Sequence, residues 1–152
     1  MVSLERLRLF TKFTPSGVSQ KLNDSYMKEI IKKFRFKSAG VVINAPKDLE
    51  KEFEQLGFKT ALDKKSSNSQ TLVFVNNKKE FMKFLTNELR NIEHDSVLWF
   101  AYPKGSSGIR TDINRDILRE TAEKFSITTV TAISINKTWS ALRFRPIDKV
   151  GK

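Results

Sequence analysis

The alternation of short apolar runs with helix-like segments, between residues 39 and 125, constrains this chain more than any other feature. Three runs, 39–43, 71–75 and 97–102, are almost continuously apolar. Such runs are typical of strands buried on both faces, as in a parallel sheet. The segments between them repeat apolar residues three and four positions apart, which predicts helices. The pattern therefore predicts βαβ units with right-handed crossovers.

Local signals mark where these helices begin and end. Asp24 is the expected N-cap of a helix that continues to about Phe34. The helix after residue 47 is expected to end at Gly57, since glycine is the usual residue of a left-handed C-cap. A third helix is expected over residues 78–91. A fourth follows the loop 104–111, with Thr111 or Asp112 as its N-cap.

The C-terminal part of the chain changes pattern. Residues 128–135 and 140–145 are rich in β-forming residues and flank Asn136-Lys137-Thr138, which predicts a hairpin. A weak strand is also expected near residues 59–62. The predicted fold is α/β and three-layer Rossmann-like, with a mostly parallel sheet of five or six strands and a C-terminal antiparallel hairpin. We expect one domain over residues 1–152, with a core at 23–147 and an N-terminal arm at 1–22.

Composition excludes several classes of site. The chain has no cysteine, so a disulfide framework, a thiolate zinc site and a cysteine nucleophile are excluded. His94 is the only histidine, which excludes paired-histidine chemistry. No apolar run approaches the roughly 20 residues of a membrane span, and the N-terminus lacks the apolar core of a signal peptide. We therefore expect a cytoplasmic protein with no membrane partner.

The chain is strongly basic. Lys and Arg number 28 against 17 Asp and Glu, which gives a net charge of +11. Residues 1–40 hold nine of the cations and three of the acidic residues. Such a field attracts polyanions, so nucleic acid or an acidic protein is a candidate partner. The alternative is that the charge only keeps the protein soluble, because no arginine-rich block or RNA-binding motif is present.

The carboxyl ends of the predicted parallel strands are the expected place for a ligand. Three segments follow these ends: 44–47, 76–78 and 103–112. The third is longer than the 2–6 residues that a strand-to-helix connection needs, and it leads into a helix. Its backbone N–H groups, hydroxyls and cations suit a phosphate or carboxylate group. The candidate ligand-binding residues are Asn44, Asn76, Lys104, Ser106, Ser107, Arg110, Asp112 and Trp139.

Plainer interpretations of these residues remain open. The Gly-Ser-Ser-Gly segment at 105–108 is also typical of a flexible loop, and it lacks the spacing of a Walker loop. Trp139 either packs on the sheet or forms the wall of a pocket. His94 is interpreted as an exposed turn residue. Ser106, Ser107 and Ser140 have no local motif that marks a nucleophile, so no catalytic residue and no metal ligand is assigned.

Three segments resemble a family of small bacterial proteins that is known only as a domain of unknown function. They are Val-Val-Ile-Asn-Ala-Pro at 41–46, Pro-Lys-Gly-Ser-Ser-Gly at 103–108 and Thr-Trp-Ser-Ala-Leu at 138–142. The resemblance covers roughly residues 20–147. It implies a Rossmann-like fold and a bacterial origin, and it brings no established activity.

A weaker likeness, in architecture only, is to class I methyltransferases, whose last helix and antiparallel strand pair are similar to residues 112–145. Those enzymes place a glycine-rich turn after the first strand, where this chain has Asn44-Ala45-Pro46. Ala45 adds bulk and Pro46 removes a backbone donor. Asp63 is the only nearby candidate for a ribose-binding acid. The usual binding of adenosylmethionine or a dinucleotide is therefore not expected.

Three functions follow from these observations. The first is a non-enzymatic domain that binds an anionic small ligand, of phosphate or nucleotide type, at the loop 104–112. The second is binding of nucleic acid or an acidic protein through the basic N-terminal segment. The third is a diverged transferase, for which the sequence offers no nucleophile or general base. The sequence specifies neither a cofactor nor an oligomeric state.

Overall fold

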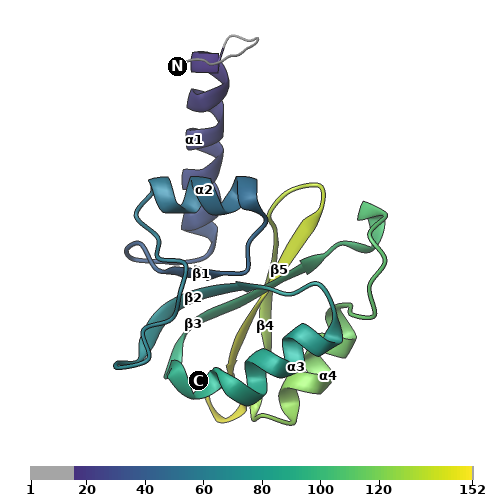
Figure 1. Cartoon of the computed structure of the whole chain (residues 1–152). Coiled ribbons are helices and arrows are strands. Elements are labelled where there is room, and N and C mark those ends of the chain that lie inside the picture. Colours follow the sequence, from purple (N-terminus) through teal and green to yellow (C-terminus); the bar gives the residue numbers. More distant parts are fainter. Residues whose placement is uncertain (1–15, 152) are drawn as a thin grey trace. The chain divides into compact units, whose positions relative to one another are not determined.

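The computed structural model describes the backbone of residues 16–151 and the side chains of residues 25–151. In that part of the chain, four α-helices and a five-stranded open sheet form a mixed α/β fold (Figure 1). The predicted α/β class is confirmed. Residues 1–15, which hold most of the expected N-terminal arm, lie outside the described residues. The chain divides into two compact units, residues 1–33 and residues 34–152.

The described part of the first unit is helix α1 (Ser16–Lys33). The helix begins eight residues before Asp24, so the predicted N-cap at Asp24 is wrong. Residues 18–33 contain no proline or glycine, and nothing local stops the helix from extending in the N-terminal direction. Lys32 and Lys33 lie in its last turn, where cations interact favourably with the helix dipole.

The sheet of the second unit has the strand order β1-β2-β3-β5-β4. β1, β2 and β3 are parallel, whereas β5 is antiparallel to both of its neighbours. The strands are β1 (Val41–Ile43), β2 (Asn68–Phe74), β3 (Ile92–Pro103), β4 (Ile127–Ser134) and β5 (Trp139–Pro146). The carboxyl ends of β1, β2 and β3 therefore meet at one edge of the sheet.

Helices follow each of these three strands. They are α2 (Lys47–Gln55), α3 (Lys78–Asn87) and α4 (Arg115–Glu123). In Figure 1, α3 and α4 lie side by side on one side of the sheet and α2 lies on the opposite side. Gly57 has φ +93°, which confirms the predicted left-handed residue after α2. The strand expected at 59–62 reduces to a single bridge, in which the Val42 N–H donates to the Lys59 carbonyl at 2.8 Å.

Aromatic rings fill the core between the sheet and the helices α3 and α4. Phe81 and Phe84 of α3 each meet Phe100 of β3 edge to face, with ring centroids 4.9 and 5.4 Å apart. Phe144 of β5 meets the same ring at 5.3 Å. Burying these rings removes a large apolar area from water and fixes α3 against β3 and β5.

A second aromatic group lies on the other face of the sheet. Trp99 of β3 is fully buried, and its indole N–H donates to the Phe34 carbonyl at 2.9 Å. The Phe34 ring packs edge to face on the same indole at 5.3 Å. Phe53 of α2 packs on Phe58 at 5.0 Å. Both faces of the central strands are thus buried, as their continuous apolar sequences predict.

Candidate functional site

The loops at the carboxyl ends of β1 and β2 leave in opposite directions, toward α2 and α3 respectively (Figure 1). In open parallel sheets this divergence opens a crevice where ligands bind. Asn44 follows β1 and Asn76 comes two residues after the end of β2, so the fold brings these two predicted site residues to the same edge.

Glu80 of α3 joins the two asparagines. One carboxylate oxygen accepts hydrogen bonds from the Asn44 amide at 3.2 Å, the Asn76 amide at 3.1 Å and the Asn76 backbone N–H at 2.9 Å. The Asn44 amide also donates to the Phe74 carbonyl at 3.1 Å. Asn44 has φ +61°, a left-handed conformation that asparagine tolerates better than most residues. These hydrogen bonds therefore attach the turn after β1 and the turn after β2 to α3.

The sequence analysis did not identify Glu80 as a site residue, although a local signal was present. Asn77 is the N-cap of α3, and its side chain accepts from the Glu80 backbone N–H at 2.8 Å. An N-cap followed three residues later by glutamate is the pattern of a capping box. Here the carboxylate reaches Asn76 and Asn44 instead of the N-cap residue itself.

Thr111 and Asp112 attach the long β3–α4 loop to the start of α3. The Thr111 hydroxyl donates to the Asn76 carbonyl at 2.6 Å, and the Lys78 backbone N–H donates to the Asp112 carboxylate at 2.8 Å. The predicted role of Thr111 or Asp112 as N-cap of α4 is wrong. Asn114 is the cap, because its side chain accepts from the Ile117 N–H at 2.9 Å. Asp112 instead places a negative charge at the start of α3.

Hydrogen bonds within the first half of the β3–α4 loop stabilise its conformation. Gly105–Ser107 forms one turn of 3₁₀-helix, and Gly108 follows with φ +83°. The Ser107 hydroxyl donates to the Lys104 carbonyl at 2.6 Å and accepts from the Ile109 N–H at 3.2 Å. The Lys104 ammonium donates to the Ser134 hydroxyl of β4 at 2.6 Å. Ser106 is exposed.

The second half of the loop curves around a hollow of about 570 Å³, which we call the β3–α4 hollow. Its lining residues are Tyr102, Pro103, Gly105, Ile109, Arg110, Thr111, Ile113 and Asn114. Arg110 is the predicted site residue that lines it. Arg110 is also exposed, so its guanidinium is accessible to a ligand. Because Asn114 caps α4, the hollow includes the start of that helix.

Tyr102 is one of the residues that line this hollow. Burial raises the pKa of Tyr102 above its ordinary value, against smaller opposing effects of a Ser140 hydrogen bond and the Arg115 charge. The phenol therefore stays protonated at neutral pH and keeps its O–H as a donor. Arg115, the first residue of α4, is close enough to act on that phenol electrostatically. The residues that line the hollow thus include a tyrosine, an exposed arginine and the N-cap of a helix.

Trp139 lies at the amino end of β5 and is almost fully buried. Its ring meets Phe74 edge to face, with centroids 5.0 Å apart. Trp139 was expected either to pack on the sheet or to form the wall of a pocket, and these contacts are those of packing on the sheet.

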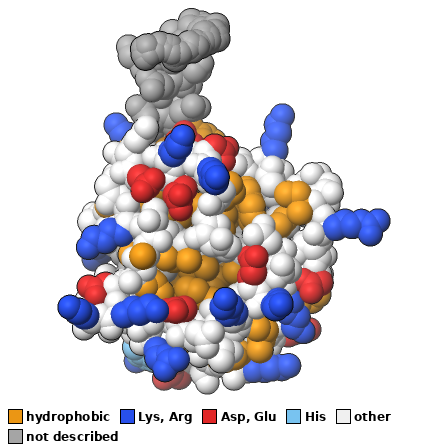
Figure 2. All heavy atoms as spheres, in the orientation of Figure 1, with side chains coloured by type: hydrophobic (Ala, Val, Ile, Leu, Met, Phe, Trp, Pro, Cys, Tyr) orange, Lys and Arg blue, Asp and Glu red, His pale blue; other side chains and the backbone are white. Residues whose placement is uncertain are grey.

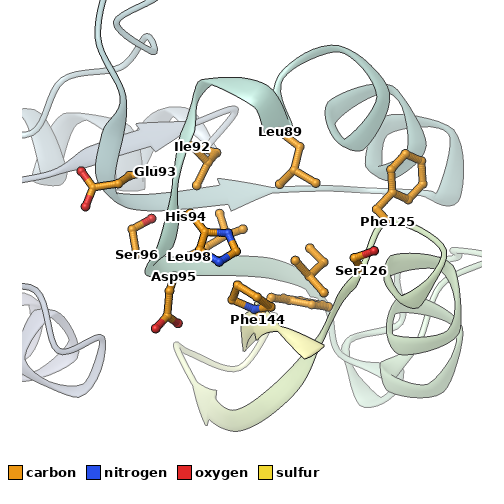
Figure 3. Close-up of a pocket in the computed structure, with 12 residues that line it drawn as sticks. Leu89, Ile92, Glu93, His94, Asp95, Ser96, Leu98, Phe125, Ser126 and Phe144 are labelled. Carbon is orange, nitrogen blue, oxygen red and sulfur yellow. The ribbon is translucent and has the colours of Figure 1, made fainter. Parts of the chain in front are cut away.

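A second and smaller hollow, of about 200 Å³, lies where the amino end of β3 meets the chain after α4 (Figure 3). Leu98 and Phe144 form part of its apolar lining, and His94 is another of the lining residues and is exposed. The predicted exposure of His94 is confirmed, although the residue belongs to β3 rather than to a turn.

An ion pair fixes the rim of this smaller hollow. The Arg145 guanidinium donates to both carboxylate oxygens of Asp95, at 2.9 and 3.1 Å. These hydrogen bonds hold the pKa of Asp95 below its ordinary value. Asp95 has φ +56°, so the bidentate pair also holds a left-handed backbone conformation that is uncommon for residues other than glycine.

Comparison with known proteins gives this chain no family. No protein-family model matches it, and neither does any curated protein. The candidate site therefore depends on its geometry alone.

Two further features bear on the class of site. Among the side chains described, those of residues 25–151, no group of three or more His, Asp or Glu is placed to hold a metal ion. The described helices include none that is both long and apolar enough to cross a bilayer.

Proposed function

We propose that this protein is a binding domain for a small anionic ligand, of phosphate or nucleotide type, which occupies the β3–α4 hollow. The observation that carries the proposal is the accessible Arg110 guanidinium in a hollow that also contains the start of α4. Guanidinium groups bind phosphate oxygens through two parallel hydrogen bonds, and helix N-termini favour negative charge. The volume of about 570 Å³ falls in the range of known small-ligand sites.

The other predicted residues have supporting roles in this proposal. Ser107 and Asp112 hold the loop in its curved conformation, whereas Asn44 and Asn76 fix the neighbouring turns through Glu80. Lys104 bonds to Ser134 and adds positive charge near the loop. Arg110 is the direct anion ligand, and Tyr102 donates a second hydrogen bond.

The proposal also includes the finer description of the fold as a three-layer Rossmann-like domain with a C-terminal hairpin, of the kind found in the bacterial family that its segments resemble. The positions of α2 and α3 on opposite sides of the sheet support it (Figure 1). The antiparallel pairing of β4 with β5 supports the hairpin. A cytoplasmic location is part of the same proposal.

We assign the site to binding rather than catalysis because its groups donate hydrogen bonds and positive charge. A diverged transferase is the alternative. Such an enzyme needs a group that takes a proton near neutral pH, and the raised pKa of Tyr102 makes this phenol a poor base there.

The test measures the binding of inorganic phosphate and of adenosine nucleotides at low salt by calorimetry and thermal shift. A ligand at about 100 times its dissociation constant adds about 2.7 kcal/mol, which raises the melting temperature by several degrees at this chain length. Arg110→Ala should weaken binding at least about tenfold, since it removes a charge-assisted hydrogen-bond donor.

Arg90→Ala is the matched control, because Arg90 is an exposed arginine that does not line this hollow. The control should bind as the wild type does. Equal binding by Arg110→Ala and the wild type would place the ligand elsewhere. If only polyanions bind and raise the melting temperature, and if added salt removes this effect, the result would favour the second candidate function.

That second candidate is the binding of nucleic acid through the basic N-terminal segment. Of the described side chains there, Lys28, Lys32, Lys33, Arg35 and Lys37 are all exposed. Over the second unit, the cations on the visible face are spread out, with acidic side chains between them (Figure 2). The observation in its favour is thus the excess of cations between residues 28 and 37. Binding of short DNA or RNA that falls steeply with salt, and that weakens in Lys32→Glu/Lys33→Glu, would support it.

A further inference from the structure

Strand β4 (Ile127–Ser134) lies at the end of the sheet, and β5 is its one strand neighbour among the described residues. An edge strand presents unpaired backbone N–H and C=O groups on its outer side. These groups form a template on which another strand pairs. Natural edge strands usually carry lysine, proline or inward-pointing charges that prevent such pairing.

The sequence of β4 lacks these protective residues. Residues 125–136 form a stretch of twelve residues without a charged side chain or proline, in a chain with 30% charged residues. The other uncharged stretch of this length, residues 66–77, contains the central strand β2. Six of the eight residues in β4 are β-branched. β4 therefore has the composition of an interior strand.

Its exposure is that of an edge strand. Val130, Thr131, Ala132 and Ser134 are exposed, whereas most of β2 is buried. A register shift at Val130 interrupts the pairing with β5 between Thr129 and Thr131. Glu123 accepts a hydrogen bond from the Thr128 hydroxyl and brings a charge to the first half of the strand. The half from Thr131 to Ser134 is regularly paired with β5 and holds no charged residue, and the Lys104 ammonium reaches its last residue by donating to the Ser134 hydroxyl.

From this arrangement we propose that the outer edge of β4, through Thr131–Ser134, pairs antiparallel with β4 of a second copy of the chain and extends the sheet across a two-fold axis. Residues near such an axis face their own copies, so a charged residue there meets a like charge. The net charge of +11 makes two copies repel each other over most of their surface. Because β4 holds no charged residue of its own, two copies approach each other there at lower cost than over the charged surface. An acidic partner would instead be matched by cations on the strand.

The experiment is sedimentation velocity of the full chain over a wide range of concentration. The mass should rise with concentration from 17.5 kDa toward twice that value. Raising the salt concentration from about 0.05 to about 0.5 M should strengthen the dimer, because it screens the repulsion between two basic chains. A monomer under all these conditions would overturn the proposal.

Substitutions that introduce a positive or a negative charge at the same position locate the interface. Thr131→Lys and Thr131→Glu should each abolish the dimer, because each places like charges across the two-fold axis. Thr86→Lys and Thr86→Glu are the matched controls, since Thr86 is an exposed threonine of α3. These controls alter the net charge by the same amounts and should still form dimers.

If the net charge of the chain alone controlled association, the result would differ. Thr131→Glu would then strengthen the dimer, because it lowers the repulsion between the two basic chains. A stronger dimer for Thr131→Glu, or an unchanged dimer for both Thr131 variants, would overturn the proposal. Circular dichroism and the melting temperature verify that each variant is folded. If either Thr131 variant fails to fold, the same pair of substitutions at Ala132, which is also exposed, replaces it.

Discussion

Asp112 lies in the loop before α4 and yet accepts a hydrogen bond from the first residue of α3, Lys78, which lies 34 residues earlier in the chain. We predict that Asp112→Ala destabilises the protein by about 1–2 kcal/mol, the typical cost of losing a side-chain acceptor at a helix N-terminus. The magnitude follows from the 2.8 Å hydrogen bond between the Lys78 N–H and the carboxylate, with the favourable interaction of a negative charge with the α3 dipole added.

The comparison with Asp112→Asn separates these two contributions. The amide retains an oxygen acceptor but has no charge, so this variant should lose only about 0.3–1 kcal/mol. Urea denaturation of the three proteins measures the differences in the free energy of unfolding. At this chain length, each kcal/mol corresponds to a fall of about 2–4 °C in the melting temperature.

The loop should also loosen, because Asp112 and Thr111 attach it to the start of α3. Hydrogen exchange of the backbone N–H groups in residues 104–111 should therefore accelerate in Asp112→Ala. An alanine variant with wild-type stability and wild-type exchange in this loop would refute the reasoning.

Three further predictions concern other contacts. Gly40→Ala should destabilise the protein by about 1–3 kcal/mol in urea denaturation, because a Cβ there would lie 2.3 Å from the Gln70 carbonyl oxygen; a neutral effect would contradict this packing. The Asp95–Arg145 pair lowers the pKa of Asp95, so its stabilisation is present above the unfolded-state pKa and is lost as the pH falls through the folded-state value. A double-mutant cycle of Asp95→Ala and Arg145→Ala should therefore show coupling at pH 7 that decreases as the pH falls below the ordinary pKa of aspartate, and a coupling that does not depend on pH would refute it. Tyr102→Phe should weaken phosphate binding about tenfold with little change in the melting temperature, and unchanged binding would exclude the phenol as a donor.

Much of the fold was predictable because its signals are local. The apolar runs at 71–75 and 97–102 became the central strands β2 and β3, since a strand buried on both faces has no polar residues to alternate. Gly57 marked the end of α2 because the conformation required there suits glycine. The parallel direction of the first three strands followed from the helices between them.

The structure corrected the predictions that depended on choosing between equivalent local signals. Thr111, Asp112 and Asn114 are all good capping residues within four positions, and the sequence does not show which of them begins α4. Asn114 does so because Asp112 and Thr111 are engaged with the start of α3. The start of α1 was missed because Asp24 resembles an N-cap even when the helix continues on both sides of it.

The sequence by itself determined the class of the fold, the central strands and the edge of the sheet at which a site is expected, because these follow from short-range periodicity. Only the tertiary structure decided which side chains form that site. Glu80 joins Asn44 to Asn76, Lys104 turns toward Ser134, and Arg110 is left to line the hollow. The first two contacts connect elements that are distant in the chain, and the Asn44–Glu80 and Lys104–Ser134 bonds span 36 and 30 residues. Such contacts produce no periodic pattern in the sequence, because they depend on how the strands and helices pack and not on the neighbouring residues in the chain.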